Sequence, residues 1–353
     1  MSFKNGMNPD AKRFGTGTKF ISVMDILNNQ YICYDNIRAS VELQDGDIEA
    51  YGVNYGDILF QRSSETLEDI GRANVYLDSK PAIFGGFVIR GKSKDNYNPL
   101  FFRYLLASPT ARKRIIVKGA GAQHFNIGQD ALSKVFIDIP TLKEQKKIGK
   151  LLQCLDERIA TQNKIIDKLQ SLIKGIRHDI FNDIQGEVLA LSNIADIYQP
   201  QTISSSDLTT EGYWVYGANG IIVKYKEYNH ETEQICITCR GNTCGTVNYT
   251  QPKVWITGNS MVINTDKYQR QVNKRFLFHY LSSYNFNSIV SGSGQPQIVR
   301  TPLEKIKVVL PTIEKQVRIA NSIDIVSEKI DTESLVLRLL ENQKQYLLRQ
   351  MFI

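Results

Sequence analysis

Apolar residues recur every three or four positions along two stretches of this chain, residues 140–182 and 311–353. This spacing places the apolar side chains in one row along a helix, and over several heptads it is typical of a coiled-coil seam. A helix of about 40 residues is about 60 Å long and must bury such a row. The seam residues are Ile148, Leu152, Leu155, Ile159, Ile166, Leu169, Ile173, Ile176 and Ile180 in the first stretch, and Ile319, Ile323, Val326, Ile330, Leu337, Leu340, Leu347 and Met351 in the second.

The second stretch repeats the first. Residues 140–145 and 311–316 both read Pro-Thr-x-x-x-Gln, with Gln145 and Gln316 in the last place, and the match continues without a gap to Phe181 and Phe352. One layer of the seam is polar in both copies, at Gln162 and at Glu333. Each long helix is therefore predicted to pack against the other copy.

A mixed α/β pattern precedes each long helix. Residues 1–139 alternate short apolar runs with turn residues, and residues 183–310 repeat the same plan more loosely. We predict strands at 19–23, 58–62, 75–77, 87–89 and 135–139, with helices at 101–107 and 111–117. The predicted counterparts in the second domain are a strand at 236–240, a helix at 276–281 and a strand at 306–310. Glycine-rich loops at 118–124 and 291–297 also correspond.

The two domains differ at their start. The second opens with residues 189–213, including the apolar run 191–197, and nothing equivalent precedes Met7 in the first. The first domain is therefore predicted either to be shorter or to take an opening segment from elsewhere.

Composition narrows the class of protein. A hydrophobic fraction of 42% and a charged fraction of 22% are those of an ordinary globular chain. No long apolar run predicts a membrane span, and no signal peptide precedes the first domain, so we expect a cytoplasmic protein. The net charge of +7 suits a polyanionic partner.

Five cysteines, an odd number, argue against a disulfide framework, and Cys236-x-x-Cys239 with Cys244 lacks a fourth nearby zinc ligand.

None of the catalytic or cofactor-binding motifs that the sequence resembles is complete. Asn98-Pro99 followed by Leu100-Phe101 lacks the second proline of the motif that seats a flipped adenine, and a helix start explains it equally well. Gly119 and Gly121 do not complete a dinucleotide fingerprint, and there is no Walker A or Gly-x-Ser-x-Gly sequence.

Polar side chains near glycine are the candidate readers of DNA, because base edges need bidentate donors and a close backbone approach. Arg62 and Arg240 are predicted to end equivalent strands, and the glutamines and the histidine lie on equivalent glycine loops. The candidate DNA-binding residues are Arg62, Arg72, Gln123, His124, Tyr216, Asn219, Arg240, Gln295 and Gln297.

The order domain, helix, domain, helix resembles the specificity subunits of type I restriction–modification systems. The resemblance is carried by the Pro-Thr-x-x-x-Gln entries and by the strand-Arg-Gly stretch at 235–247. It implies two target-recognition domains, residues 1–139 and 183–310. It also implies two spacer helices, residues 140–182 and 311–353, that pack antiparallel with pseudo-two-fold symmetry.

The resemblance further implies a non-catalytic subunit that reads a bipartite site on double-stranded DNA. Two methyltransferase subunits would dock on the helices, with Gln145, Ile148, Leu152, Leu155, Ile159, Gln316, Ile319, Ile323, Val326 and Ile330 as the partner-binding and seam residues. S-adenosylmethionine, ATP and Mg²⁺ would belong to these subunits and to restriction subunits, with no cofactor or metal in this chain. An enzyme, or a coiled-coil scaffold without DNA specificity, stays open as an alternative.

Overall fold

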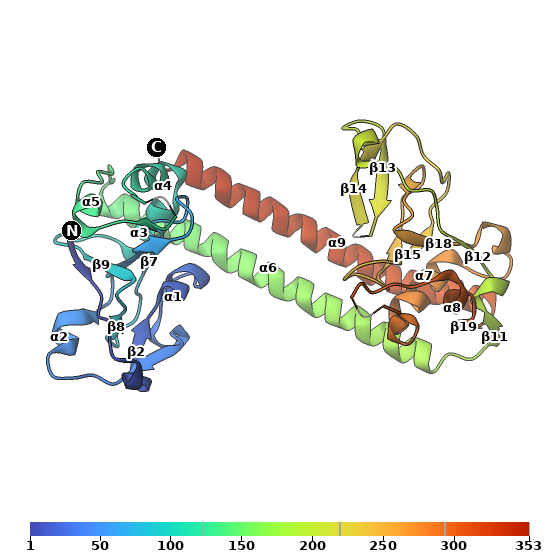
Figure 1. The fold of residues 1–353 in the computed structure, drawn as a ribbon, viewed down its shortest axis with the longest axis horizontal. Coiled ribbons are helices and arrows are strands. Elements are labelled where there is room, and N and C mark those ends of the chain that lie inside the picture. The colour runs from blue at the N-terminus through green and yellow to red at the C-terminus, as the bar shows by residue number, and fades with distance from the viewer. Residues whose placement is uncertain (122, 219, 293, 353) are drawn as a thin grey trace. The chain divides into compact units, whose positions relative to one another are not determined.

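The computed structural model describes residues 1–352 except 122, 219 and 293. The chain divides into two compact units, one formed by Met1–Asn163 with Leu335–Ile353 and the other by Lys164–Ser334. Each unit combines short strands and helices with parts of both long helices (Figure 1). The predicted mixed α/β class is confirmed.

The first unit is built on two four-stranded sheets. One has the order β1 (Ser2–Asn5), β9 (Val88–Lys92), β5 (Ile58–Gln61) and β7 (Ala73–Val75), with every pair antiparallel. The other has the order β3 (Ala39–Val41), β2 (Phe14–Ile21), β8 (Ala82–Phe84) and β4 (Gly52–Val53), and its β2–β8 pair is parallel. A small ladder joins β6 (Ser63–Ser64) to β10 (Phe125–Asn126).

The second unit repeats this plan. Its antiparallel sheet has the order β12 (Asp196–Tyr198), β18 (Ser260–Asn264), β15 (Ile235–Thr238) and β16 (Val247–Tyr249). Its second sheet has the order β14 (Gly220–Tyr225), β13 (Tyr213–Gly217) and β17 (Trp255–Ile256), and its β13–β17 pair is parallel. A further ladder joins β11 (Glu187–Ala190) to β19 (Lys307–Leu310).

Helices complete both units. The first contains α1 (Val23–Asn28), α2 (Asp47–Tyr51), α3 (Pro99–Ala107), α4 (Pro109–Ile116) and α5 (Gln129–Ser133), and the second contains α7 (Lys274–Ser283) and α8 (Arg300–Glu304). Asn98 and Asn273 cap α3 and α7 in the same way, each accepting a hydrogen bond from the third backbone N–H of its helix. The long helices are α6 (Leu142–Asn182) and α9 (Ile313–Gln350), where the heptad pattern predicts them.

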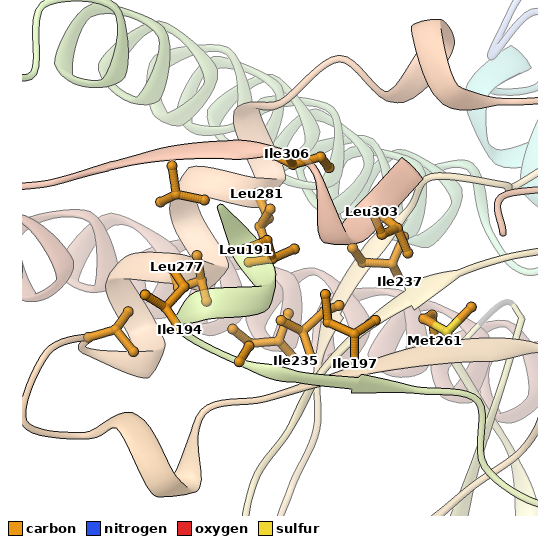
Figure 2. Close-up of a cluster of buried hydrophobic side chains, with 14 of the residues drawn as sticks. Leu191, Ile194, Ile197, Ile235, Ile237, Met261, Leu277, Leu281, Leu303 and Ile306 are labelled. Atoms are coloured by element: carbon orange, nitrogen blue, oxygen red, sulfur yellow. The ribbon is translucent and has the colours of Figure 1, made fainter. Parts of the chain in front are cut away.

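The largest core lies in the second unit (Figure 2). Leu277 and Leu281 of α7 pack on one face of β15, through Ile235 and Ile237, and Leu191 fills the space between them. Alternation along β15 sends Cys236 to the opposite face, where it joins a separate buried cluster. Burial raises the pKa of the Cys236 thiol to about 12.

The long-helix segments within the first unit run antiparallel. Leu152 of α6 shares a cluster with Leu348 of α9, and Asp156, one turn further along α6, forms an ion pair with Lys344, one turn earlier on α9. Residue numbers rise along α6 while those of the contacting residues fall along α9, so the two helices run in opposite directions. The helices of this unit therefore meet as the repeated seam predicts.

Two predicted strands are wrong in detail. The strand predicted at 19–23 begins earlier, at Phe14 of β2, and Val23, expected in that strand, begins α1. Gly17 explains the first difference, because its φ of 91° lets the chain bulge where a side chain would meet the carbonyl oxygen of Val41. The strand expected at residues 135–139 is extended chain without a ladder partner.

The expected difference at the domain starts is smaller than predicted. Strand β1 (Ser2–Asn5) pairs with β9 as β12 (Asp196–Tyr198) pairs with β18, so these two opening strands correspond. Only β11 and the turn after it, Leu191–Asn193, lack a counterpart in the described part of the first unit.

Candidate nucleic-acid interface

In the second unit, two segments distant in sequence meet just beyond the end of β15. Arg240 forms a β-bridge with Gln297, and this bridge is flanked by backbone hydrogen bonds from Gly241 N to Pro296 O (3.0 Å) and from Ile298 N to Cys239 O (3.0 Å). Arg240 is exposed and Gln297 is half-buried. The pairing therefore places an arginine and a glutamine at neighbouring backbone positions, and these are side-chain types that can read purine edges.

The first unit builds the same pair of segments with different side chains. Ser63 of β6 pairs with Asn126 of β10, and the Ser63 hydroxyl donates to the Asn126 side-chain oxygen. Ile127 N donates to Arg62 O at 3.0 Å, as Ile298 N donates to Cys239 O in the second unit. We call these two equivalent places, Ser63 with Asn126 and Arg240 with Gln297, the paired loops.

The glycine loops hold the remaining candidates next to the paired loops. Gly121 and Gly292 are equivalent and both have a positive φ, and a side chain at either would meet a backbone carbonyl oxygen, that of His124 or that of Gln295. Glycine is required there because the chain turns back on itself. The turn leaves Gln123 and His124 exposed in the first unit and Gln295 exposed in the second.

Arg62 does not correspond to Arg240, contrary to the sequence-based prediction. The pairing within each unit makes Arg62 equivalent to Cys239 and Ser63 equivalent to Arg240, a shift of one residue from the predicted correspondence. A shift of one turns a side chain to the other face of a strand. Arg62 is half-buried, and its guanidinium donates a hydrogen bond to Gly86 O at 3.2 Å. At the equivalent place in the second unit, the Cys239 thiol lies 3.8 Å from Gly258 O. Arg62 therefore fixes the loop instead of facing outward.

The other predicted readers are scattered. Arg72 forms an ion pair with Asp69 at 2.7 Å and lines a separate pocket of about 380 Å³ with Arg103 and Arg112. Tyr216 is only 7% exposed and packs in a buried cluster, so its assignment as a surface reader is wrong. Asn219 lies outside the described residues.

Three exposed or half-buried positions at or beside the paired loops are not among the predicted residues. Ser63 follows Arg62 and Asn126 follows the glycine loop, and no sequence motif marks either of them. Phe87 is 67% exposed, and its carbonyl accepts a hydrogen bond from Arg62 N at 2.9 Å. The equivalent carbonyl in the second unit belongs to Asn259, so an aromatic stands where the other unit has an amide.

The repeated Pro-Thr-x-x-x-Gln sequence has a structural role in both units. Gln316 accepts a hydrogen bond from Asn273 N (2.8 Å) and donates to Pro311 O (2.9 Å), and Gln145 makes the equivalent bonds to Asn98 N and Pro140 O. Both glutamines are almost fully buried. Each glutamine therefore joins the start of a long helix to the capped start of an earlier helix of the same unit, α3 or α7. The amide oxygen and the amide nitrogen of each side chain are both hydrogen-bonded, as buried polar atoms generally are.

The apolar residues predicted to bind partner subunits are buried or half-buried in this chain. Leu152, Leu155 and Ile323 are buried, and the half-buried ones are Ile148, Ile159, Ile319, Val326 and Ile330. Their packing is therefore within this chain. The helices also carry large apolar residues that are exposed, namely Leu151, Ile165, Leu172, Val317, Ile325, Leu335, Leu339 and Tyr346.

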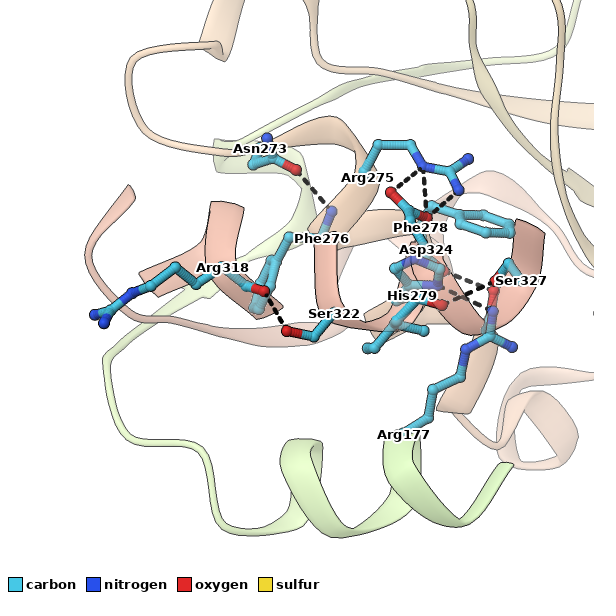
Figure 3. A network of polar contacts seen from close by, with 12 residues as sticks. Arg177, Asn273, Arg275, Phe276, Phe278, His279, Arg318, Ser322, Asp324 and Ser327 are labelled. Carbon is cyan, nitrogen blue, oxygen red and sulfur yellow. Dashed lines mark hydrogen bonds and ion pairs between the residues drawn. The ribbon is translucent and has the colours of Figure 1, made fainter. Parts of the chain in front are cut away.

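A carboxylate on a long helix anchors the globular part of the second unit (Figure 3). Asp324 of α9 accepts from Arg275 Nε at 3.0 Å and from His279 Nε2 at 2.8 Å, while Arg177 of α6 reaches His279 Nδ1 at 2.9 Å. Burial, the largest cause, lowers the pKa of His279 to about 4. Burial alone would raise the pKa of Asp324, but its bonds to Arg275 and His279 hold it below its usual range.

The first unit has a comparable anchor. Asp156 of α6 accepts from Tyr104 Oη at 2.8 Å and from Gln30 at 3.1 Å, and it pairs with Lys344 of α9 at 2.5 Å. Tyr104 occupies the place of His279 on the equivalent helix, counted from the capping asparagines. Both units therefore use one acid on a long helix, buried Asp156 or half-buried Asp324, to hold α3 or α7.

Known proteins share this duplicated arrangement. The family model described as "Type I restriction modification DNA specificity domain" matches residues 3–171 and again residues 184–342. The chain belongs to this family. It is a type I specificity subunit with two target recognition domains.

Two relatives of this specificity subunit match most of the chain at modest identity. The putative type I restriction enzyme MjaX specificity subunit of Methanocaldococcus jannaschii is 28% identical over 327 residues, which cover 82% of this chain and 76% of that protein. The MjaVIII specificity subunit of the same organism is 25% identical over 329 residues, covering 79% and 74%.

A crystal structure supports the fold of the specificity subunit. The type I system S subunit from M. genitalium aligns with 100% of this chain and 93% of its own, with a TM-score of 0.64 and 17% sequence identity. Within the described residues, no helix is both long and apolar enough to span a bilayer, and no cluster of His, Cys, Asp and Glu could hold a metal ion.

Proposed function

We propose that this specificity subunit reads a bipartite site on double-stranded DNA, one half with each recognition domain. The paired loops carry the proposal. A duplicated scaffold presents Ser63 with Asn126 in one domain and Arg240 with Gln297 in the other, at equivalent backbone positions. The backbone positions are equivalent, whereas the side chains differ and can all contact bases. This combination suits two domains that read different sequences. The net charge of +7 suits contacts with phosphates.

The same subunit is proposed to be non-catalytic and to recruit the enzymes that act on the site. Two methyltransferase subunits would dock on the long helices, and restriction subunits would join the full complex. Because the seam residues are used within each unit, the exposed apolar residues of the helices, such as Leu172 and Leu339, are the better candidates for docking. S-adenosylmethionine, ATP and Mg²⁺ would bind the partner subunits, and none would bind this chain.

The test is an exchange of recognition domains in cells that carry the modification subunits. Residues 183–310 are replaced by the corresponding residues of a relative with a different target, and methylated adenines are mapped by sequencing. We expect one half of the methylated sequence to change and the other half to stay. A matched exchange of residues 1–139 should change the other half. An unchanged pattern in both exchanges would contradict reading by these domains and favour a scaffold without DNA specificity.

A further inference from the structure

Three arginines gather around one pocket of the first unit. Arg72, Arg103 and Arg112 line this pocket of about 380 Å³, and we call it the arginine pocket. Glu68 also lines it, so the charged residues of the lining carry an excess of two positive charges. The remaining lining residues are apolar, namely Ile26, Leu27, Ala73, Leu106, Ala107 and Ile116. A cavity in which positive charge prevails attracts anions.

Two of these arginines have no carboxylate partner. Arg103 donates from Nε to Gln30 O at 2.6 Å. Arg112 donates from Nη2 to Ile70 O at 2.6 Å. Among the described residues, neither arginine forms an ion pair. Backbone carbonyls therefore hold both guanidinium groups in place without neutralising them.

The surroundings make these charges costly. Burial, the largest cause, and the positive charge of Arg72 lower the pKa of Arg112 to about 10. Burial likewise lowers the pKa of Arg103. In the described part of the chain, Arg112 Nη1 is buried and has no hydrogen-bond partner. An anion in the pocket would oppose both causes, because a nearby opposite charge favours the charged form of a group.

The second unit carries other residues at two of these positions. Arg72 O accepts the backbone hydrogen bond that ends the pairing of β5 with β7 (2.7 Å), and Thr246 O accepts the equivalent bond between β15 and β16 (2.9 Å). Counted from the capping asparagines, Phe278 takes the place of Arg103. The shared fold therefore forms without these two arginines, which points to a function for them other than stability.

The arginine pocket borders the loops that are proposed to read DNA. Gln61 N donates to Arg72 O at 2.7 Å, and Gln61 lies two residues before Ser63 of the paired loop. On the other side, Ile116 O accepts from Gly119 N at 2.9 Å, where the glycine loop begins. Duplex DNA carries one phosphate charge per about 1.7 Å of its axis. A duplex held at the paired loop therefore presents phosphates close to the pocket.

We propose that the arginine pocket binds a backbone phosphate of the DNA that the first domain reads. Arginine suits this ligand, because its guanidinium can donate two parallel hydrogen bonds to phosphate oxygens. A phosphate contact fixes the position of the duplex but carries no sequence information. The pocket therefore positions the first half-site, while Ser63 and Asn126 contact its bases. This inference rests on the proposed reading of DNA.

The experiment uses the complex assembled with its modification subunits. The double variant Arg72→Thr with Arg103→Phe introduces the residues that the second unit has at the equivalent positions. It should weaken binding to specific and to random DNA by the same factor. The fall in affinity between about 50 and about 200 mM salt should shrink about threefold, because one phosphate contact is lost. Fluorescence anisotropy titrations of both DNAs measure these changes.

Two outcomes of these titrations would overturn the inference. One is a loss confined to specific DNA, which would make the arginines readers of bases. The other is an unchanged salt dependence. Arg72→Thr alone changes an exposed side chain, so it tests the same salt dependence without the more buried Arg103.

A matched control separates the arginine pocket from net charge. Lys80→Thr with Lys113→Thr also removes two positive charges, from exposed positions of the first unit outside the pocket. We expect this control to keep the salt dependence of the unmodified complex. An equal change in both double variants would assign the effect to net charge and overturn the inference.

Inorganic phosphate distinguishes DNA from a free anion. Thermal unfolding of the full chain is compared in phosphate and in chloride at equal ionic strength. Stabilisation by phosphate that the pocket variant loses, with DNA binding unchanged, would assign the pocket to a free anion and overturn the inference. The proposed reading of DNA fails separately, if the unmodified complex does not prefer its target to random DNA.

Discussion

At the scale of single residues, two arginines at or beside the paired loops have different surroundings. Arg240 is exposed beside Gln297, whereas Arg62 is half-buried and bonded to Gly86 O. Both arginines follow a buried strand, and the sequence alone cannot tell which of two successive residues faces outward at a strand end. The one-residue shift was decided by pairing with distant residues, Asn126 in one unit and Gln297 in the other.

Replacement of Arg240 tests this distinction. If Arg240 pairs with a guanine edge, Arg240→Ala should weaken binding of the assembled complex to its specific DNA by about 1–3 kcal/mol and relax the choice of base in one half-site, because that bidentate contact is lost. Arg62→Ala, the matched control, should lower stability by about 1 kcal/mol through the lost hydrogen bond and leave the ratio of specific to random binding unchanged. Competition titrations with both DNAs measure that ratio. Equal losses for Arg240→Ala on specific and random DNA would show a phosphate contact only.

At the scale of elements, pattern alone predicted the helices well and one strand badly. The heptad seams predicted α6 and α9, because apolar residues that repeat over several heptads indicate a long helix from local sequence alone. Residues 135–139 have the same apolar alternation as β19, but a strand exists only where another strand pairs with it. The sequence indicates that the two domains start differently. Only the pairing of β1 with β9 limits the segment without a counterpart to β11 and the turn after it.

The anchor between α7 and α9 makes a prediction about pH. Burial holds the pKa of His279 at about 4, below the value of about 6.5 that it has in the unfolded chain. A depressed folded pKa gives stability that is present above the unfolded pKa and lost as the pH falls. His279 should therefore cost the second unit about 2 kcal/mol between about pH 7.5 and about pH 5. Both tryptophans, Trp214 and Trp255, lie in this unit, so urea unfolding followed by their fluorescence measures the loss.

His279→Asn supplies the comparison for that pH dependence. Its stability should be lower at neutral pH, since Arg177 and Asp324 lose their shared partner, but the fall between the two pH values should shrink by about 2 kcal/mol. His230, whose pKa burial also lowers to about 4, accounts for part of the remaining slope. The control His124→Gln changes an exposed histidine and should keep the full slope. An unchanged slope in His279→Asn would mean that folding leaves the pKa of this histidine unchanged.

At the scale of the whole molecule, the proposed bipartite reading gives the long helices a function as a spacer. α6 contains 41 residues and α9 contains 38, and each belongs partly to both units. If the helices set the distance between the readers, one heptad added to both, after Ile166 and after Leu337, should lengthen each by about 10 Å. Seven residues keep the seam on nearly the same face, with a drift of about 20°.

The gap between the two half-sites should then grow by up to about 3 base pairs, because the duplex advances about 3.4 Å per pair. Both half-site sequences should stay the same, since neither paired loop has changed. Sequencing of methylated DNA from cells with the lengthened subunit measures the gap. The control replaces seven residues at each position with the same heptad and keeps the length, so it should keep the gap. Altered half-sites with an unchanged gap would show that the helices bind partner subunits without setting the distance between the readers.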